Sequence, residues 1–171
     1  MNLRSEILKE HSKPQALKIA KWIGKDASRF KALMDLFLFG EYRVVQRSAW
    51  IVSSCAENHP ELIKPWMKKM LLKTQEKNVH DAVKRNVMRI LQFVEIPKSL
   101  QGLAADIAFQ FLANKNEAVA IRVFSMTVLL NLTHKEPDLK QELRLLIEEN
   151  LPYEKAAFKS RGRKVLKSLS K

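Results

Sequence analysis

The stretch at residues 117–122 reads Glu117-Ala118-Val119-Ala120-Ile121-Arg122, and similar stretches that end on an arginine recur along the chain. The other three are Tyr42-Arg43-Val44-Val45-Gln46-Arg47, His80-Asp81-Ala82-Val83-Lys84-Arg85 and Ala156-Ala157-Phe158-Lys159-Ser160-Arg161. The final arginines of the four stretches recur with a period of about 38 residues. A near-constant period of this length predicts a repeat architecture, in which each supersecondary unit buries its apolar face against its neighbours.

A second mark keeps nearly the same period. Pro60, Pro97 and Pro137 also recur at a spacing of about 38 residues, and each opens an amphipathic segment. Proline is tolerated in the first turn of a helix, where its missing N–H would have had no partner. Two unrelated signals in phase therefore predict that each repeat is a pair of helices.

The apolar spacing between these marks is helical. In the third repeat Leu100, Leu103, Ile107 and Phe111 recur at steps of three and four residues, and no stretch shows sustained strand-like alternation. The predicted first helices run over 26–39, 60–76, 97–114 and 137–150, and the second helices over 41–57, 80–95, 117–133 and 154–169. We expect Gly40 to end the first of these in the left-handed conformation. Residues 2–24, split at Ser12-Lys13-Pro14, predict one or two further helices that cover the N-terminal end.

This pattern resembles the HEAT-like members of the armadillo/HEAT superfamily, on the strength of the arginine-marked openings at Arg47, Arg85 and Arg122. The resemblance implies an all-α fold, a right-handed α-solenoid of about four HEAT-like helix pairs with an N-terminal helical cap. We expect a single domain over residues 1–171, with the cap at 1–25 and repeats at roughly 26–58, 59–95, 96–134 and 135–171. A tetratricopeptide array is disfavoured because its period is shorter, at about 34 residues.

Members of that superfamily often carry an acidic residue about six positions before the arginine, where it pairs with a neighbouring arginine. Glu41 stands at this position and Asn116 is a polar substitute, whereas Val79 and Lys155 depart from the pattern. A regular ladder of such pairs is therefore not expected.

The charge balance favours anionic partners. The chain carries 31 Lys and Arg against 18 Asp and Glu, a formal net charge of +13. Such a field attracts nucleic acid, anionic membrane surfaces and acidic protein patches, although a well-solvated surface would look the same.

Catalytic and metal-binding patterns are missing from the sequence. It has no Gly-rich phosphate loop, no Gly-x-Ser-x-Gly elbow and no His-Glu-x-x-His, and its four histidines are far apart. His59 and His134 are expected to be loop or cap residues, and Cys55, in an apolar stretch, a core residue. We therefore expect no enzyme activity, no cofactor, no metal and no small-molecule substrate. The lone cysteine and the absence of a signal-like N-terminus predict a cytoplasmic protein.

The second helices are expected to line the concave side of the solenoid and to supply its binding surface. The candidate binding residues are Arg43, Arg47, Trp50, Lys84, Arg85, Arg89, Arg122, Lys159, Arg161, Arg163 and Lys164. Arginines can grip carboxylate or phosphate with two hydrogen bonds. Two alternatives stay open: Arg47, Arg85 and Arg122 brace one repeat against the next, and Trp50 packs between repeats.

These features favour a non-enzymatic interaction module that binds a protein with an acidic surface. Nucleic acid is the alternative ligand, since DNA alkylation-repair glycosylases are also built from HEAT-like repeats with a basic concave face. The Trp and Asp positions of that family's site have no match here. A third hypothesis is attachment to an anionic membrane through the basic amphipathic segment from Lys155 to Lys171.

Overall fold

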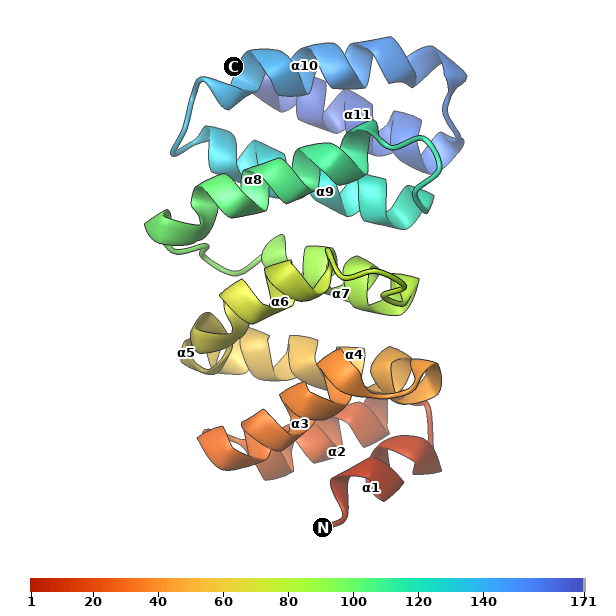
Figure 1. Ribbon diagram of the computed structural model, residues 1–171, viewed down its shortest axis with the longest axis vertical. Helices are drawn as coiled ribbons and strands as arrows, with labels where there is room; N and C mark the ends of the chain where they lie inside the picture. Colours follow the sequence, from red (N-terminus) through yellow and green to blue (C-terminus); the bar gives the residue numbers. More distant parts are fainter. Residues whose placement is uncertain (171) are drawn as a thin grey trace. The chain divides into compact units, whose positions relative to one another are not determined.

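The computed structural model describes residues 1–170, and Lys171, the last residue of the predicted fourth repeat, lies outside the described residues. The fold of this range is all-α, with no strand among its elements (Figure 1). The chain divides into two compact units, unit 1 over Met1–Glu95 and unit 2 beginning at Ile96. Each unit has its own core and is described by itself.

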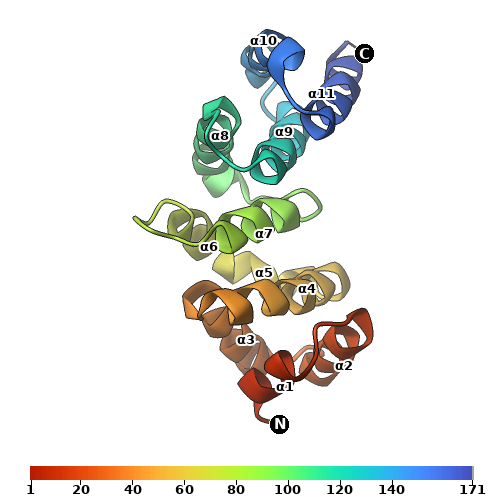
Figure 2. The same ribbon diagram turned by 90° about the vertical axis from the view of Figure 1, so that its right-hand side faces the viewer.

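Unit 1 holds the N-terminal cap and two helix pairs. Its helices are α1 (Leu3–Lys9), α2 (Lys13–Ile23), α3 (Ala27–Phe39), α4 (Tyr42–Asn58), α5 (Pro60–Ile63), α6 (Met67–Lys73) and α7 (Asp81–Leu91). Helix α3 pairs with α4. Helices α5 and α6 together form the first half of the next pair, and α7 is its second half. Helices α2, α4 and α7 pack side by side in one layer, while α3 and α6 belong to the other (Figure 2).

Unit 2 holds the remaining two helix pairs. Its helices are α8 (Lys98–Ala113), α9 (Val119–Thr133), α10 (Leu139–Asn150) and α11 (Ala156–Leu169), with a 3₁₀ turn at Leu151–Tyr153. Helix α9 lies at the centre, where it packs against α8, α10 and α11. The predicted helix pairs and the predicted split of the cap are therefore confirmed, with helix ends that differ by a few residues.

Side-chain caps begin the first three helices. Asn2 accepts a hydrogen bond from the amide of Ser5, Ser12 from that of Gln15, and Asp26 from those of Ser28 and Arg29. These short oxygen-bearing side chains satisfy amide groups that have no partner within the helix. The residue before each of these helices thus sets where the helix starts.

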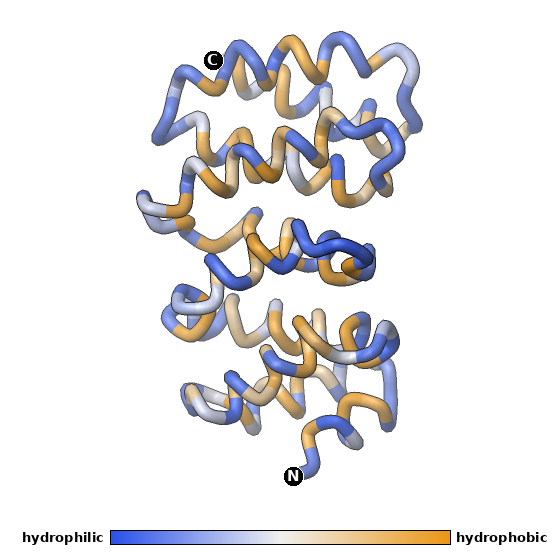
Figure 3. Tube along the Cα trace, viewed as in Figure 1, coloured by the Kyte–Doolittle hydropathy of each residue, from blue (hydrophilic) through white to orange (hydrophobic). Residues whose placement is uncertain are grey.

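Amphipathic helices form the core of each unit. Blue and orange segments alternate along the helices in Figure 3, as expected when one face of each helix is buried. In unit 1 the side chains of Phe30, Leu33 and Phe37 are fully buried on α3, and in unit 2 those of Leu143 and Ile147 are fully buried on α10. Each pair therefore buries its apolar stripe against neighbouring helices, as a repeat architecture requires.

The predicted helix over residues 60–76 is interrupted, which corrects the sequence-based expectation. A 3₁₀ turn at Lys64–Trp66 separates α5 from α6. Pro65 at its centre has no N–H to donate to the carbonyl four residues earlier, so the α-helical ladder cannot continue through it. The predicted helix over 80–95 also ends early, at Leu91.

Gly40 ends α3 as expected, but not in the left-handed conformation. Its φ is −71°, an ordinary value, and its N–H donates to the carbonyl of Leu36. Glycine is needed here for space, because an added β-carbon would collide with that carbonyl and lie 3.0 Å from a methyl group of Val44. The glycine with positive φ is Gly24, at the C-terminal end of α2.

Candidate binding site

One exposed stripe of α4 gathers several of the predicted binding residues. Arg43, Arg47, Trp50, Ser54 and Glu57 follow one another at steps of three and four residues, which places them on one face of the helix. Arg43 and Glu57 are exposed, and Arg47 is half-buried. Apolar residues on the opposite face, such as Val45 and Val52, are fully buried and hold the helix in place.

Trp50 is the aromatic centre of this stripe. The residue keeps 38% of its surface exposed, whereas tryptophan is highly buried on average. The ring of His11, from the turn before α2, stacks on it with a centroid distance of 5.1 Å and an angle of 12° between the planes. Trp50 is therefore held against the cap and is not packed between repeats.

A cleft of about 310 Å³ opens beside this ring, between α2, α4 and α7. We call it the Trp50 cleft. It is lined by Lys13, Ala16, Leu17, Trp50, Ser53, Ser54, Glu57 and Arg89. Apolar contact surface from Leu17 and Trp50 thus lies next to the cations of Lys13 and Arg89, with one carboxylate, Glu57, at the edge.

An unpaired hydroxyl lies in the wall of the Trp50 cleft. Ser53 is 5% exposed, and its Oγ has no hydrogen-bond partner within residues 1–170. A buried polar group without a partner costs free energy, so such groups are rare unless they serve a ligand or hold water. The cleft therefore offers two cations and an aromatic surface to a bound group.

The other predicted residues of α4 and α7 have different environments. Arg47 donates a hydrogen bond of 2.6 Å from Nη1 to the carbonyl of Leu8 at the end of α1. Lys84 lies 3.8 Å from the carboxylate of Asp81, one turn earlier on α7. Arg85 is half-buried and has no hydrogen bond or ion pair in the described part of the chain.

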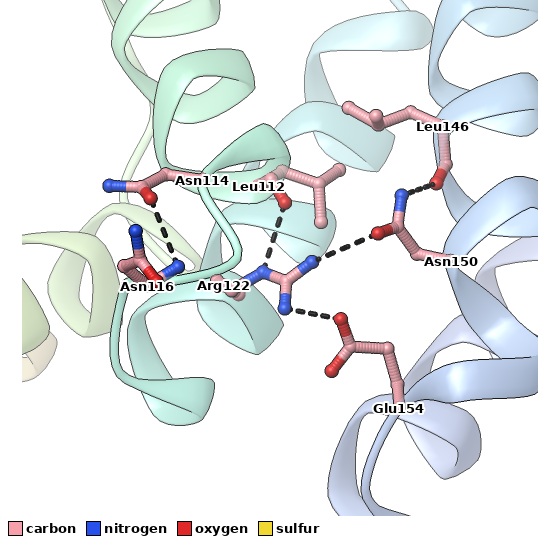
Figure 4. Close-up of polar contacts among 7 residues, drawn as sticks. All are labelled: Leu112, Asn114, Asn116, Arg122, Leu146, Asn150 and Glu154. Carbon is pink, nitrogen blue, oxygen red and sulfur yellow. Dashed lines mark hydrogen bonds and ion pairs between the residues drawn. The ribbon is translucent and has the colours of Figure 1, made fainter.

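Arg122 in unit 2 is a structural residue and leaves the candidate surface. It is 2% exposed. Its Nε donates to the carbonyl of Leu112 at 3.0 Å, its Nη1 pairs with Glu154 at 2.5 Å, and its Nη2 approaches Asn150 at 3.5 Å (Figure 4). The guanidinium also lies 4.7 Å from the centroid of the Phe158 ring. These contacts tie α8, α9, α10 and α11 together, and a partner cannot reach the charge.

The predicted basic residues of α11 divide into two groups. Arg163 and Lys164 are exposed, and Lys159 is half-buried. Arg161 is half-buried and donates to the hydroxyl of Thr127 on α9, which fixes α11 against its neighbour.

The predicted residues belong to both units and are described for each unit by itself. The structure brings Trp50 and Arg89 together at one cleft in unit 1, with Arg47 and Arg85 one turn away on the same two helices. In unit 2 the basic residues Lys159, Arg163 and Lys164 stay together on α11.

The groups able to perform chemistry are few in residues 1–170. Burial raises the pKa of the Cys55 thiol to about 12, so the thiolate is scarce at neutral pH. His59 and His134 end α4 and α9, as predicted. Within the described range no group of His, Cys, Asp and Glu side chains is arranged to hold a metal ion. No helix in that range has the length and apolar character needed to cross a membrane.

The sequence-based prediction missed the contribution of the cap to the site. Lys13 and Leu17, four residues apart on α2, form one wall of the Trp50 cleft, and His11 supports the ring. The spacing of Lys13 and Leu17 places them on one face of α2. Because the cap lies outside the repeat, the period of the arginines does not predict which helices this face contacts.

Comparisons with known proteins agree with this architecture. A family model described as a HEAT repeat domain matches residues 3–169, nearly the whole chain. Neither the curated proteins nor the solved structures contain a match to the sequence.

Proposed function

Because this chain belongs to the HEAT repeat family, we propose that it is a non-enzymatic scaffold whose Trp50 cleft binds an acidic segment of a partner protein. HEAT repeats generally mediate protein–protein interactions, and the family is typically non-enzymatic. The observation that supports the acidic partner is the combination of Trp50 with Lys13 and Arg89 in one cleft.

The chemistry of the cleft fits a carboxylate-bearing segment. Arg89 offers a planar fork that can hold a carboxylate with two hydrogen bonds, while Lys13 adds a second positive charge. The exposed parts of Trp50 and Leu17 give apolar area to a neighbouring side chain. Trp and Arg in a partly desolvated pocket are the residue types that dominate binding energy at protein interfaces.

Charge reversal tests the proposal. The double variant Lys13→Glu/Arg89→Glu is expected to reduce the recovery of partners that co-purify with the tagged full chain by about tenfold or more, since like charges then face each other across the interface. Trp50→Ala is expected to have a similar effect through loss of the aromatic anchor. Quantitative mass spectrometry of the purified complexes measures both.

The matched control is Lys98→Glu/Lys115→Glu, which reverses the charge of two exposed lysines of unit 2 and so makes the same change in net charge. Circular dichroism shows whether each variant is folded. Unchanged recovery of every partner with a folded Lys13→Glu/Arg89→Glu variant disproves the proposal.

Nucleic acid is the second candidate ligand, favoured by the exposed Trp50 ring beside two cations, with the Glu57 carboxylate in the same cleft. Phosphate binding predicts an affinity for duplex DNA that falls steeply with salt, with a log–log slope of about 0.9 per phosphate contacted. Fluorescence anisotropy of labelled DNA over a salt series measures it. A flat response, or no binding at low salt, eliminates this candidate, and incubation with alkylated DNA tests base release separately.

A further inference from the structure

The other layer of helices in unit 1 carries a second surface that combines exposed apolar side chains with lysines. Phe39, the last residue of α3, is 54% exposed, and Leu72 on α6 is 49% exposed. Together with Pro65, Lys68, Lys69 and Lys73 they line a groove of about 470 Å³, which we call the Phe39–Leu72 groove. Solvent-exposed apolar side chains that gather in one groove mark a site of contact with another molecule.

Two lysines flank the exposed phenylalanine. The ammonium of Lys69 lies 4.8 Å from the centroid of the Phe39 ring and 5.3 Å from that of Trp66, and the ammonium of Lys73 lies 4.7 Å from the Phe39 ring. Cation–π contacts at exposed sites such as this one are individually weak. The aliphatic parts of these two lysines cover part of the Phe39 ring. The residue nevertheless keeps 54% of its surface exposed, so a partner can reach it.

The charge at this groove is strongly one-sided. Between residues 64 and 77 the chain has five lysines and one glutamate. Lys69 and Lys73 lie four residues apart on α6, an arrangement that slightly destabilises a helix through repulsion. Among these lysines, the ion pair found within residues 1–170 is that of Lys73 with Glu76, at 2.5 Å. Within residues 1–170 the charges of Lys68 and Lys69 at the groove are therefore not neutralised by an ion pair.

We propose that the Phe39–Leu72 groove docks a short amphipathic segment of a partner protein that carries acidic residues beside a large apolar side chain. The apolar side chain enters the hollow between Phe39 and Leu72, and its flanking carboxylates pair with Lys68 and Lys69. A hollow receives a protruding side chain, whereas attachment to a lipid surface needs apolar groups that project.

This site is separate from the Trp50 cleft. The groove is built by α3 and α6 with the turn between α5 and α6, and the cleft by α2, α4 and α7, which form the other layer of unit 1 (Figure 2). The proposal does not depend on the function assigned to the cleft. If both are correct, unit 1 can hold two acidic segments at once, which suits a scaffold.

The test uses a defined probe with the full chain. The probe is a capped helix-forming peptide of about 14 residues, long enough for a marginally stable helix in water. It carries leucines at steps of three and four residues and glutamates on the flanking positions. Titration of the isotope-labelled protein is expected to shift the NMR signals of Phe39, Lys69 and Leu72. In fluorescence anisotropy, Leu72→Ser and Phe39→Ser are each expected to weaken binding by about fivefold to tenfold, the range expected for loss of one well-packed apolar contact.

The matched control is Leu145→Ser, which changes a leucine of 47% exposure outside the groove and is expected to leave binding unchanged. Lys13→Glu/Arg89→Glu is expected to leave the peptide-induced shifts of Phe39, Lys69 and Leu72 unchanged, which separates this proposal from that for the Trp50 cleft. Thermal melts followed by circular dichroism show that each variant is folded.

Four outcomes overturn the proposal. The first is the absence of shifts at millimolar peptide, and the second is shifts centred on Trp50 and Lys13. The third is equal binding of a peptide with lysine in place of every glutamate. The fourth is binding of vesicles of phosphatidylcholine with one quarter phosphatidylserine that Leu72→Ser abolishes, because the groove would then be a lipid-binding site.

Discussion

Arg47 in unit 1 and Arg122 in unit 2 occupy equivalent places in the repeated sequence, yet their environments differ. Arg122 is buried and meets a carbonyl, a carboxylate, an amide oxygen and an aromatic ring. Arg47 is half-buried and makes one hydrogen bond, to the carbonyl of Leu8. The recurring arginine therefore marks the opening of a helix, and its role depends on the acceptors that the neighbouring helices supply.

The difference has a physical origin. Glu154 and Asn150 lie 32 and 28 residues after Arg122, and the following helix pair brings them to its guanidinium. A charge can be buried only when it is paired and its donors are satisfied. Arg47 faces the short helix α1, which provides only the carbonyl at its end, so its guanidinium stays partly in solvent.

The largest expected effect is on Arg122. Arg122→Ala should lower the free energy of unfolding by about 3–5 kcal/mol, because it leaves Glu154 partly buried without its counter-ion and removes the link among four helices. Urea denaturation measures this loss. In a double-mutant cycle, Arg122→Ala and Glu154→Ala should be strongly coupled, and additive effects would contradict the assigned network.

A smaller effect is expected for Arg47. Arg47→Ala should lower the free energy of unfolding by about 1 kcal/mol, the ordinary worth of a partly exposed hydrogen bond to a carbonyl at a helix C-terminus. The loss should be confined to the cap, so hydrogen exchange of the α1 amides should accelerate while that of the α9 amides does not. A loss as large as that of Arg122→Ala would show that the two arginines are equivalent.

The smallest effect is expected for Arg85. It has no hydrogen bond or ion pair within residues 1–170, so Arg85→Ala should change the free energy of unfolding by less than about 0.5 kcal/mol. The same urea titration serves for comparison. A loss larger than that of Arg47→Ala would mean that Arg85 braces unit 1, and the contrast between the units would no longer hold.

The sequence predicted the fold well because repetition and helical spacing are local signals. The period of the arginines and prolines located every helix pair, and the caps at Ser12 and Asp26 agree with the predicted helix starts. The interruption at Pro65 was not predicted, although proline inside a helical pattern is itself a break signal. The requirement for glycine at Gly40 comes from crowding by the Leu36 carbonyl and by Val44, which the residue types alone do not reveal.

The candidate site was predicted less completely. Arg89 was predicted because basic residues recur on second helices, and Trp50 because it follows Arg47 by three residues; the structure brings both to one cleft. Lys13 and Leu17 were missed because the cap has no place in the period. The burial of Arg122 depends on contacts from a later helix pair, and the charge alone gives no indication of them. The Phe39–Leu72 groove lies on first helices, which the resemblance did not favour as a binding surface.

The break at Pro65 has a consequence for motion. Helix α5 is only four residues long, and the opening amides of any helix have no acceptor within it. The backbone of Pro60–Ile63 is therefore held by packing of Leu62 and Ile63 more than by its own ladder. Local unfolding of so short a segment breaks few helical hydrogen bonds, so we expect the turn beside the Phe39–Leu72 groove to open at a lower free-energy cost than α4.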